Sequence, residues 1–232
     1  DDSEIRIITV LLAKKTVDFD GLSKQLPAEQ PVTISGRLES DYSVPQILAM
    51  SPDGHIHTIP VSVTGQSFNF EFRTTVGLWT IEVIATGPAG PIPLAQIDLP
   101  ASAPHSETVS YRWPRDESSI DNPASYLTEL INRDRERAGL KPLRRMKTLD
   151  WVALQHSEDM RRNRFVGHFS PRTGMLTQRL DRVAHKRMVA GENVALNSTL
   201  TDAHQGLMHS LGHRKNLLSV DYTTVGIGAR KG

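Results

Sequence analysis

The chain has 232 residues, of which 38% are hydrophobic, and this is enough for one large domain or two ordinary ones with a core. It has no run of 18 apolar residues and no basic-then-apolar start, so we expect no transmembrane helix and a leader peptide that has already been removed. It contains no cysteine, which excludes disulfides and thiolate metal sites.

The net charge of +1 hides an asymmetry along the chain. Residues 1–112 carry 7 Lys and Arg against 13 Asp and Glu, whereas residues 113–232 carry 20 against 13. Such a change of sign indicates two units with different surfaces. The basic residues of the C-terminal half either keep the helices of that half in contact with water or contact an anionic partner, such as a cell-envelope polymer or a lipid.

Residues 1–100 are predicted to form an all-β antiparallel sandwich. In SFNFEF, Phe68, Phe70 and Phe72 alternate with polar residues, which places three aromatic rings on one face of a strand. RIITVLL, VTIS and LWTIEV supply further strands, and turn residues such as Pro-Asp-Gly and Gly-Pro-Ala-Gly separate the strands. This pattern loosely resembles the immunoglobulin-like accessory modules of bacterial surface proteins.

Residues 101–121 are rich in Pro, Ser and charged residues, so we expect a linker there. After it, over residues 122–232, the hydrophobic period becomes helical. Asn122 followed by Pro123 predicts the start of a helix. A second helix is expected to begin near Thr148, with His156 on its apolar face as a histidine of the core.

Five short blocks then follow one another over the C-terminal half. They read HSEDM at 156–160, GHFSP at 167–171, GENVA at 191–195, GHRKNLL at 212–218 and YTTVGIG at 222–228. This ordered set resembles the bacterial branch of the CAP superfamily, which comprises cysteine-rich secretory (SCP-like) proteins, antigen 5 and pathogenesis-related proteins. The resemblance implies a C-terminal α/β/α sandwich, and the last strand of the family's sheet is expected either to lie beyond this sequence or to be supplied differently.

The resemblance also implies a cleft lined by two histidines and two glutamates, which in some members hold a divalent metal, usually zinc. By position, His168 matches the first histidine, Glu192 the first glutamate and His213 the second histidine. Ser210 stands where the second glutamate would be, so it is expected to line the cleft without binding metal. The glycines before Glu192 and His213 would let the backbone run close to the cleft wall.

Two neutral imidazoles and one carboxylate are a sufficient first shell for Zn²⁺ with an open position for water. The three side chains come from separate segments, and no H-E-x-x-H helix occurs, so the metal site rests on the resemblance alone. The alternative is a buried polar cluster, in which the carboxylate stabilises one imidazolium and sets the geometry of the loops.

Two more expectations concern the surface of the C-terminal half. If residues 224–228 form a strand with no following neighbour, its open edge predicts some self-association. His185 and His204 lie outside the five blocks and are expected to be exposed.

Two functions remain open. The first is a secreted or cell-surface binding module, without catalysis, that recognises a lipid, glycan, cell-wall component or protein. The second is a metal-assisted hydrolase of peptide or ester bonds, with His168 and His213 as ligands and Glu192 as ligand or base. We favour the first, because family membership does not imply catalysis. No nucleophile elbow, Walker loop or zinc finger occurs, so neither nucleophilic catalysis nor a nucleic-acid partner is expected.

Overall fold

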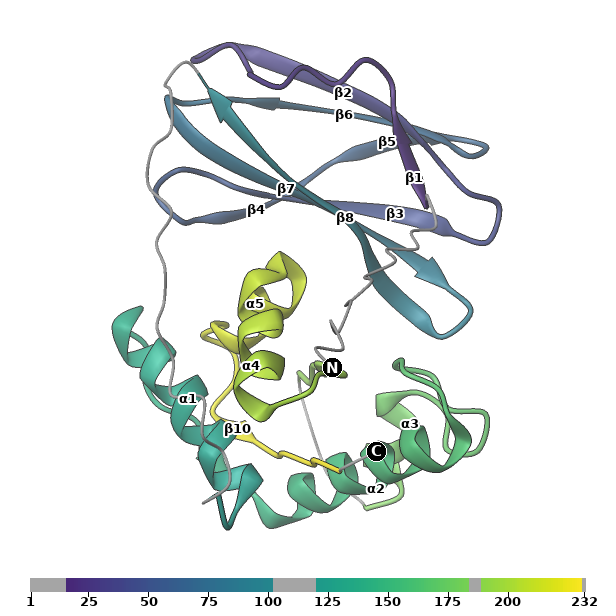
Figure 1. Ribbon diagram of the computed structural model, residues 1–232, viewed down its shortest axis with the longest axis vertical. Helices are drawn as coiled ribbons and strands as arrows, with labels where there is room; N and C mark the ends of the chain where they lie inside the picture. Colours follow the sequence, from purple (N-terminus) through teal and green to yellow (C-terminus); the bar gives the residue numbers. More distant parts are fainter. Residues whose placement is uncertain (1–15, 102–119, 184–188, 231–232) are drawn as a thin grey trace, which may run out of the picture.

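Figure 1 shows a computed structural model of the chain, in which residues 16–101, 120–183 and 189–230 are described. A sheet-rich part, residues 16–101, forms one end of the molecule, and a helical part, residues 120–230, forms the other. The predicted strand RIITVLL, most of the expected linker and His185 lie outside the described residues.

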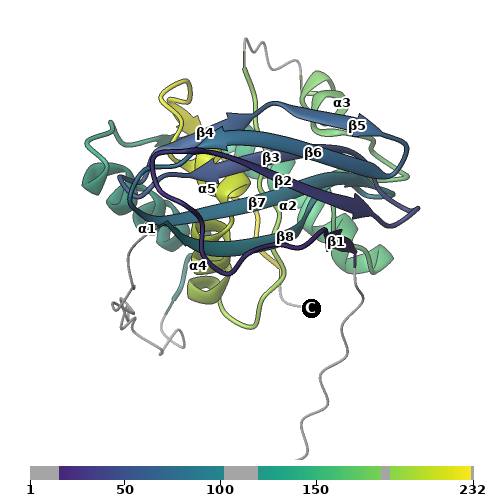
Figure 2. The ribbon, with the colours of Figure 1, turned by 90° about the horizontal axis from the view of Figure 1, so that it is seen from above.

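The sheet-rich part consists of two antiparallel four-stranded sheets, seen from above in Figure 2. The strand orders are β1-β2-β6-β5 and β4-β3-β7-β8. The strands are β1 (Val17–Phe19), β2 (Pro31–Leu38), β3 (Ser43–Met50), β4 (Ile56–Ile59), β5 (Val61–Thr64), β6 (Ser67–Arg73), β7 (Gly77–Gly87) and β8 (Gly90–Ala101). The predicted antiparallel β structure is confirmed, whereas its immunoglobulin-like character stays a prediction.

The hydrophobic core of this part lies between the two sheets. Phe68, Phe70 and Phe72 of β6 are 1%, 2% and 7% exposed, as the alternation in the sequence predicts. Ile81 and Val83 of β7 reach the same core from the other sheet. The residues that alternate with them on β7 therefore point to the opposite face of that sheet.

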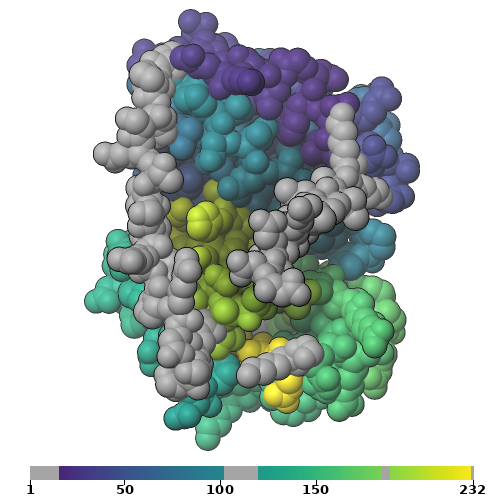
Figure 3. Space-filling view, viewed as in Figure 1, coloured from purple at the N-terminus to yellow at the C-terminus, as the bar shows by residue number. Residues whose placement is uncertain are grey.

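The helical part covers this opposite face. Leu48 and Glu82 are each only 1% exposed although they alternate with core residues, because helix α5 (Leu211–Leu217) packs on β3 and β7. The space-filling view shows the two parts in contact along the band where α5 lies (Figure 3). The two parts share a buried interface, and the division into domains at 1–100 and 122–232 stays a prediction.

The helical part contains five helices and one two-stranded parallel ladder among its described residues. Asn122 caps the first helix, since its side chain accepts a hydrogen bond of 3.0 Å from the N–H of Ser125, and Pro123 is the first helical residue. Both predicted helix starts are confirmed. Besides α5, the elements are α1 (Pro123–Arg137), β9 (Arg144–Arg145), α2 (Lys147–Asn163), α3 (Leu176–Asp181), α4 (Leu200–His209) and β10 (Thr224–Val225).

The end of the described chain lies against α2 instead of continuing as a strand. Only Thr224 and Val225 of the expected strand 224–228 pair with a neighbour, the parallel strand β9. A Cβ on Gly226 would lie 2.2 Å from the carbonyl carbon of Leu149, so this segment packs directly on the helix backbone. The α/β/α layering and self-association through this edge therefore stay predictions. None of the helices described has the length and apolar character that crossing a bilayer requires.

Candidate functional site

His168 and Glu192, two of the predicted site residues, are in direct contact. His168 Nδ1 lies 2.9 Å from one carboxylate oxygen, Oε2, of Glu192. The other oxygen accepts a hydrogen bond from Nη2 of Arg179 on α3, whose side chain is only 4% exposed. Arg179 also donates through Nη1 to the carbonyl oxygen of His168, at 3.0 Å. One buried guanidinium thus holds both predicted residues.

These contacts determine the charge of the pair. Burial by itself would raise the pKa of Glu192, but the hydrogen bond with His168 and the charge of Arg179 outweigh it, so this pKa lies below its ordinary value. Because an ionised carboxylate only accepts hydrogen bonds, the proton of the imidazole lies on Nδ1 of His168. Nε2, the other ring nitrogen, takes no part in this contact.

His213 is held near this pair through the residue that follows Glu192. Asn193 Nδ2 donates to the carbonyl oxygen of His213 at 3.0 Å, and its Oδ1 accepts from Asn216 Nδ2 at 3.0 Å. Burial, and to a lesser degree the charge of nearby His168, lower the pKa of His213. His168, Glu192 and His213 thus lie in one region, and we call His168, Arg179, Glu192 and His213 the His168 cluster. That the three predicted residues form one functional site stays a prediction.

The glycines beside the predicted residues mark close approaches of the backbone. A Cβ on Gly191 would lie 2.5 Å from the hydroxyl oxygen of Tyr222, and a Cβ on Gly212 would lie 2.7 Å from Cδ1 of Ile84. The expected close approach is therefore confirmed at both positions. Tyr222 belongs to the last of the five sequence blocks, whereas Ile84 belongs to the sheet-rich part.

Ser210 lies beside Glu82, a carboxylate that sequence reasoning missed, and its predicted place in the cleft stays a prediction. It precedes α5 and lies beside Glu82 of β7, whose Oε2 accepts a hydrogen bond of 2.7 Å from the N–H of Gly212. Burial raises the pKa of Glu82. No local signal distinguishes Glu82 from an ordinary solvent-facing residue of the strand LWTIEV.

The turn between β7 and β8 closes against the loop that carries His168. Ala89 accepts two hydrogen bonds through its carbonyl oxygen, from the N–H of His168 at 3.0 Å and from that of Phe169 at 3.1 Å. A Cβ on Gly167 would lie 2.5 Å from Cβ of Ala89, so only glycine allows this approach. The sheet-rich part therefore forms a wall beside the cluster.

Two other histidines are structural. His156 is 3% exposed and lies 2.9 Å from the carbonyl oxygen of Gly167 through Nε2, which confirms the predicted core position. The expectation that His204 is exposed is wrong, because α4 packs on α1 and leaves it 1% exposed. Its Nε2 lies 2.7 Å from Oδ2 of Asp134, so the burial is compensated by an acidic partner.

The predicted three-ligand metal site does not fit this arrangement. Both oxygens of Glu192 are engaged, one by His168 and one by the guanidinium of Arg179, which would also repel a bound cation. Across residues 16–101, 120–183 and 189–230, no three His, Cys, Asp or Glu side chains are placed to hold a metal ion. Two imidazoles remain, fewer than the three protein ligands of a catalytic zinc site.

Comparison with known proteins agrees with the five blocks. Residues 128–232 match the profile of the family described as "CAP: Cysteine-rich secretory protein family". The uncharacterized protein YkwD of Bacillus subtilis (strain 168) is 34% identical over 112 residues, which cover 48% of this chain and 44% of YkwD. The uncharacterized membrane protein YlbC of the same strain is 36% identical over 118 residues, which cover 50% of this chain and 33% of YlbC. The matched region thus spans less than half the length of these relatives.

A solved structure also resembles the chain. It is an extracellular protein containing a SCP domain from Bacillus anthracis str. Ames, with 23% sequence identity and a TM-score of 0.47. The match covers 86% of this chain and 74% of that one. On the profile match and the Bacillus relatives, residues 128–232 are a region of the CAP, or cysteine-rich secretory protein, type.

Proposed function

We propose that this chain is an exported bacterial binding module, in which the His168 cluster and the neighbouring β7–β8 turn contact a partner. The observation that supports this most is the engagement of both oxygens of Glu192 within the protein. A carboxylate held by an arginine and a histidine is not free to bind a metal or to take a proton from water. Recognition needs neither of these steps.

The cluster offers a partner a few polar groups beside an apolar rim. The side chains of His168 and Glu192 are 18% and 15% exposed, so part of each reaches the surface. Phe169, next to His168, is 41% exposed. A half-buried imidazole beside an exposed aromatic ring suits a partner with hydrogen-bonding groups on an apolar frame.

The sheet-rich part is, in this proposal, an immunoglobulin-like accessory domain. Its two sheets, β1-β2-β6-β5 and β4-β3-β7-β8, have the strand order of an immunoglobulin sandwich in which the fourth strand pairs with the third. Its β7–β8 turn adjoins the loop of His168. It would therefore contribute to the contact surface, besides acting as a spacer.

A hydrolase is the second candidate, favoured by one observation. The contact between His168 Nδ1 and Glu192 orients the ring so that Nε2 can act as a base, as in other pairs of carboxylate and imidazole. The metal-assisted form of this hydrolase loses its support, since the three predicted ligands do not form a first shell for zinc.

Zinc titration followed by calorimetry and elemental analysis separates the two candidates. We expect the wild-type protein to bind no stoichiometric zinc at neutral pH, because Arg179 neutralises Glu192. One equivalent of zinc that is lost in both His168→Ala and His213→Ala would contradict this expectation. Turnover of a peptide or ester that Glu192→Gln abolishes, with a folded variant confirmed by circular dichroism, would establish the hydrolase.

Binding is measured by co-sedimentation with isolated bacterial cell envelopes. We expect the wild-type protein to sediment with them and a Phe169→Ala variant to sediment less, because Phe169 forms the rim beside the cluster. The matched control is Val63→Ala, since Val63 is 48% exposed on β5, in the sheet that does not contact α5. Equal sedimentation of the wild type and both variants would contradict a contact surface at the His168 cluster.

A further inference from the structure

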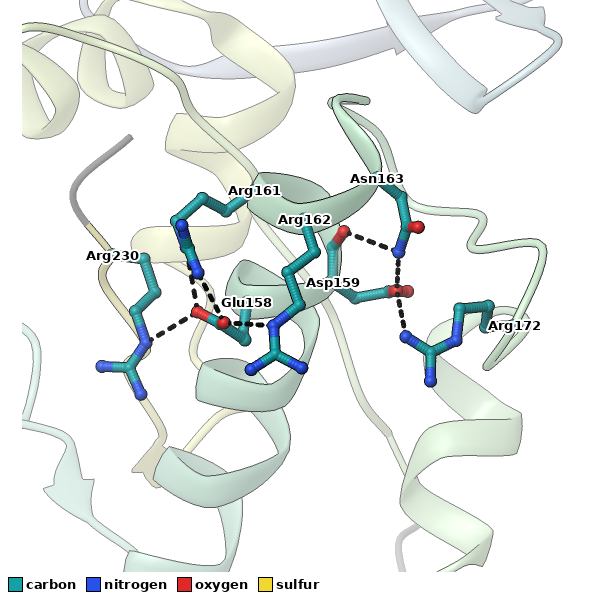
Figure 4. Close-up of polar contacts among 7 residues, drawn as sticks. All are labelled: Glu158, Asp159, Arg161, Arg162, Asn163, Arg172 and Arg230. Atoms are coloured by element: carbon teal, nitrogen blue, oxygen red, sulfur yellow. Dashed lines mark hydrogen bonds and ion pairs between the residues drawn. The ribbon is translucent and has the colours of Figure 1, made fainter.

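The outer face of α2 carries an arginine cluster that the proposed function does not use. Glu158 contacts three guanidinium groups: Nη2 of Arg161 at 2.8 Å, Nε of Arg162 at 2.5 Å and Nε of Arg230 at 3.2 Å (Figure 4). Three positive charges thus share one negative charge. Two of them are left without compensation within this group.

A fourth arginine extends the cluster. Nη1 of Arg172 lies 3.6 Å from Oδ1 of Asp159, which follows Glu158 on α2. Figure 4 shows the four arginines in a row from Arg230 to Arg172. The arginine side chains are 42% to 66% exposed, whereas those of Glu158 and Asp159 are 17% and 6% exposed. The carboxylates therefore lie beneath the guanidinium groups, and the surface presented to solvent is positive.

This arrangement persists over a wide pH range. Hydrogen bonds from Arg161 and Arg162 lower the pKa of Glu158 to about 2. The carboxylate therefore stays ionised even at mildly acidic pH and keeps accepting hydrogen bonds from the arginine side chains. An arginine that is already held in position loses less conformational entropy when it binds an anion.

An exposed tryptophan lies on the same face of the helix. Trp151 is 54% exposed and precedes Glu158 by seven residues, which is two helical turns, or about 10 Å along the axis. Gln155, between them, is also exposed. Tryptophan and arginine are among the residue types most enriched at the few interface positions that contribute most of the binding free energy.

We infer that this face of α2 binds an anionic glycan. A sugar ring stacks its C–H groups on the indole of Trp151, while phosphate, sulfate or carboxylate groups along the polymer pair with the arginine row. The excess of basic residues in the C-terminal half, 20 against 13 acidic ones, attracts such a polymer over a longer range. A bilayer fits less well, because Trp151 is the only strongly exposed large apolar residue of α2.

This surface is distinct from the His168 cluster. His156, on the buried face of α2, contacts Gly167 in the loop of His168. Trp151 and Arg162 point outward from the same helix, whereas Arg172 lies on the loop of His168, so the arginine cluster meets that loop at Arg172. Failure of one proposal leaves the other standing.

The probe is dextran sulfate, titrated by calorimetry, with neutral dextran and inorganic polyphosphate for comparison. We expect the wild-type protein to bind dextran sulfate, more weakly as salt increases, and not to bind neutral dextran. The double variant Arg161→Gln/Arg162→Gln should bind about tenfold more weakly. Glu158→Gln should bind about threefold more tightly, because the amide oxygen of glutamine can still accept hydrogen bonds from Arg161 and Arg162 while the negative charge beside them is removed.

Trp151→Ala distinguishes a glycan from any other polyanion. It should weaken binding of dextran sulfate about fivefold and leave binding of polyphosphate unchanged, since polyphosphate has no ring to stack on the indole. The matched control is Arg37→Gln, an exposed arginine of β2, and it should not change the affinity. Thermal unfolding shows whether each variant is folded.

Several results would overturn the inference. The first is a loss of affinity in Arg37→Gln as large as that in the double arginine variant. The second is a folded Glu158→Gln variant that binds dextran sulfate no more tightly than the wild type. The third is a Trp151→Ala variant that loses as much affinity for polyphosphate as for dextran sulfate. Tighter binding to phosphatidylglycerol vesicles than to dextran sulfate, lost in the same arginine variant, would show that the partner is a lipid surface instead.

Discussion

Glu82 and Glu192 are two buried carboxylates whose pKa values shift in opposite directions. Burial raises the pKa of Glu82, whose hydrogen bonds come from the N–H groups of Gly212 and Leu211 and from the side chain of Ser210. Glu192 is also buried, but His168 and Arg179 lower its pKa. The hydrogen bond with His168 and the charge of Arg179 together outweigh desolvation at Glu192, whereas the neutral donors at Glu82 do not.

This difference predicts how a Glu82→Gln substitution changes stability. Since the folded state raises the pKa of Glu82, the native protein binds more protons than the unfolded chain just above pH 4.5, the ordinary value. The wild-type protein therefore loses stability as pH rises from there through the raised pKa, and Glu82→Gln lacks this loss. Urea unfolding between pH 4 and pH 8 should show the variant gaining relative to the wild type as pH increases.

The control for Glu82 is Glu82→Ala. It leaves the N–H of Gly212 without its buried acceptor, so it should cost about 1–3 kcal/mol at every pH in this range. A Glu82→Gln variant whose stability follows that of the wild type in parallel across the range would contradict the raised pKa.

At the scale of elements, glycines decide how closely two segments approach. A Cβ on Gly226 would lie 2.2 Å from the backbone of α2 at Leu149, whereas a Cβ on Gly212 would meet the end of the Ile84 side chain at 2.7 Å. The backbone of a helix can shift less than the terminal methyl group of a side chain. A Cβ at position 226 is therefore harder to accommodate than one at position 212.

Gly226→Ala should accordingly destabilise the protein more than Gly212→Ala. We expect a loss of about 3 kcal/mol for the first and about 1 kcal/mol for the second, measured by urea unfolding. Gly206→Ala in α4 is the control, because its Cβ would meet Asn197 at an ordinary 3.4 Å and alanine favours a helix. Equal losses at positions 226 and 212 would show that the segment after β10 moves easily.

At the scale of the whole molecule, the sheet-rich and helical parts are joined by a packed interface. Leu48 and Glu82 are buried on the outer face of a sheet, against α5. Lys215 of α5 adds a hydrogen bond of 2.8 Å from its Nζ to Oγ1 of Thr58 on β4. These contacts do not depend on the chain that joins the two parts.

We therefore expect the two parts to stay together after the chain is cut. A protease site inserted between residues 102 and 119 should be cleaved, and the two pieces should elute as one species in size-exclusion chromatography. Leu48→Asp, which places a charge in the interface, should release them. Separate elution of the wild-type pieces would contradict a shared interface and favour two independent units.

The sequence by itself determined the features that repeat locally or follow a motif. Alternation of Phe68, Phe70 and Phe72 placed a strand with one buried face, and Asn122 with Pro123 placed a helix start. The ordered blocks identified the CAP family and brought His168, Glu192 and His213 to one region. These signals are readable because period, caps and motif spacing depend on residues close together in the chain.

Only the tertiary structure decided what surrounds those residues. Arg179 reaches Glu192, and Glu82 reaches Gly212 across 130 positions, without any pattern in the sequence that pairs them. The same holds for His204, which is buried because α4 packs on α1 and which there meets Asp134. Such pairings form only when elements that are distant in the sequence pack against each other. They determine which carboxylates are held by a charged partner, and the local sequence does not predict them.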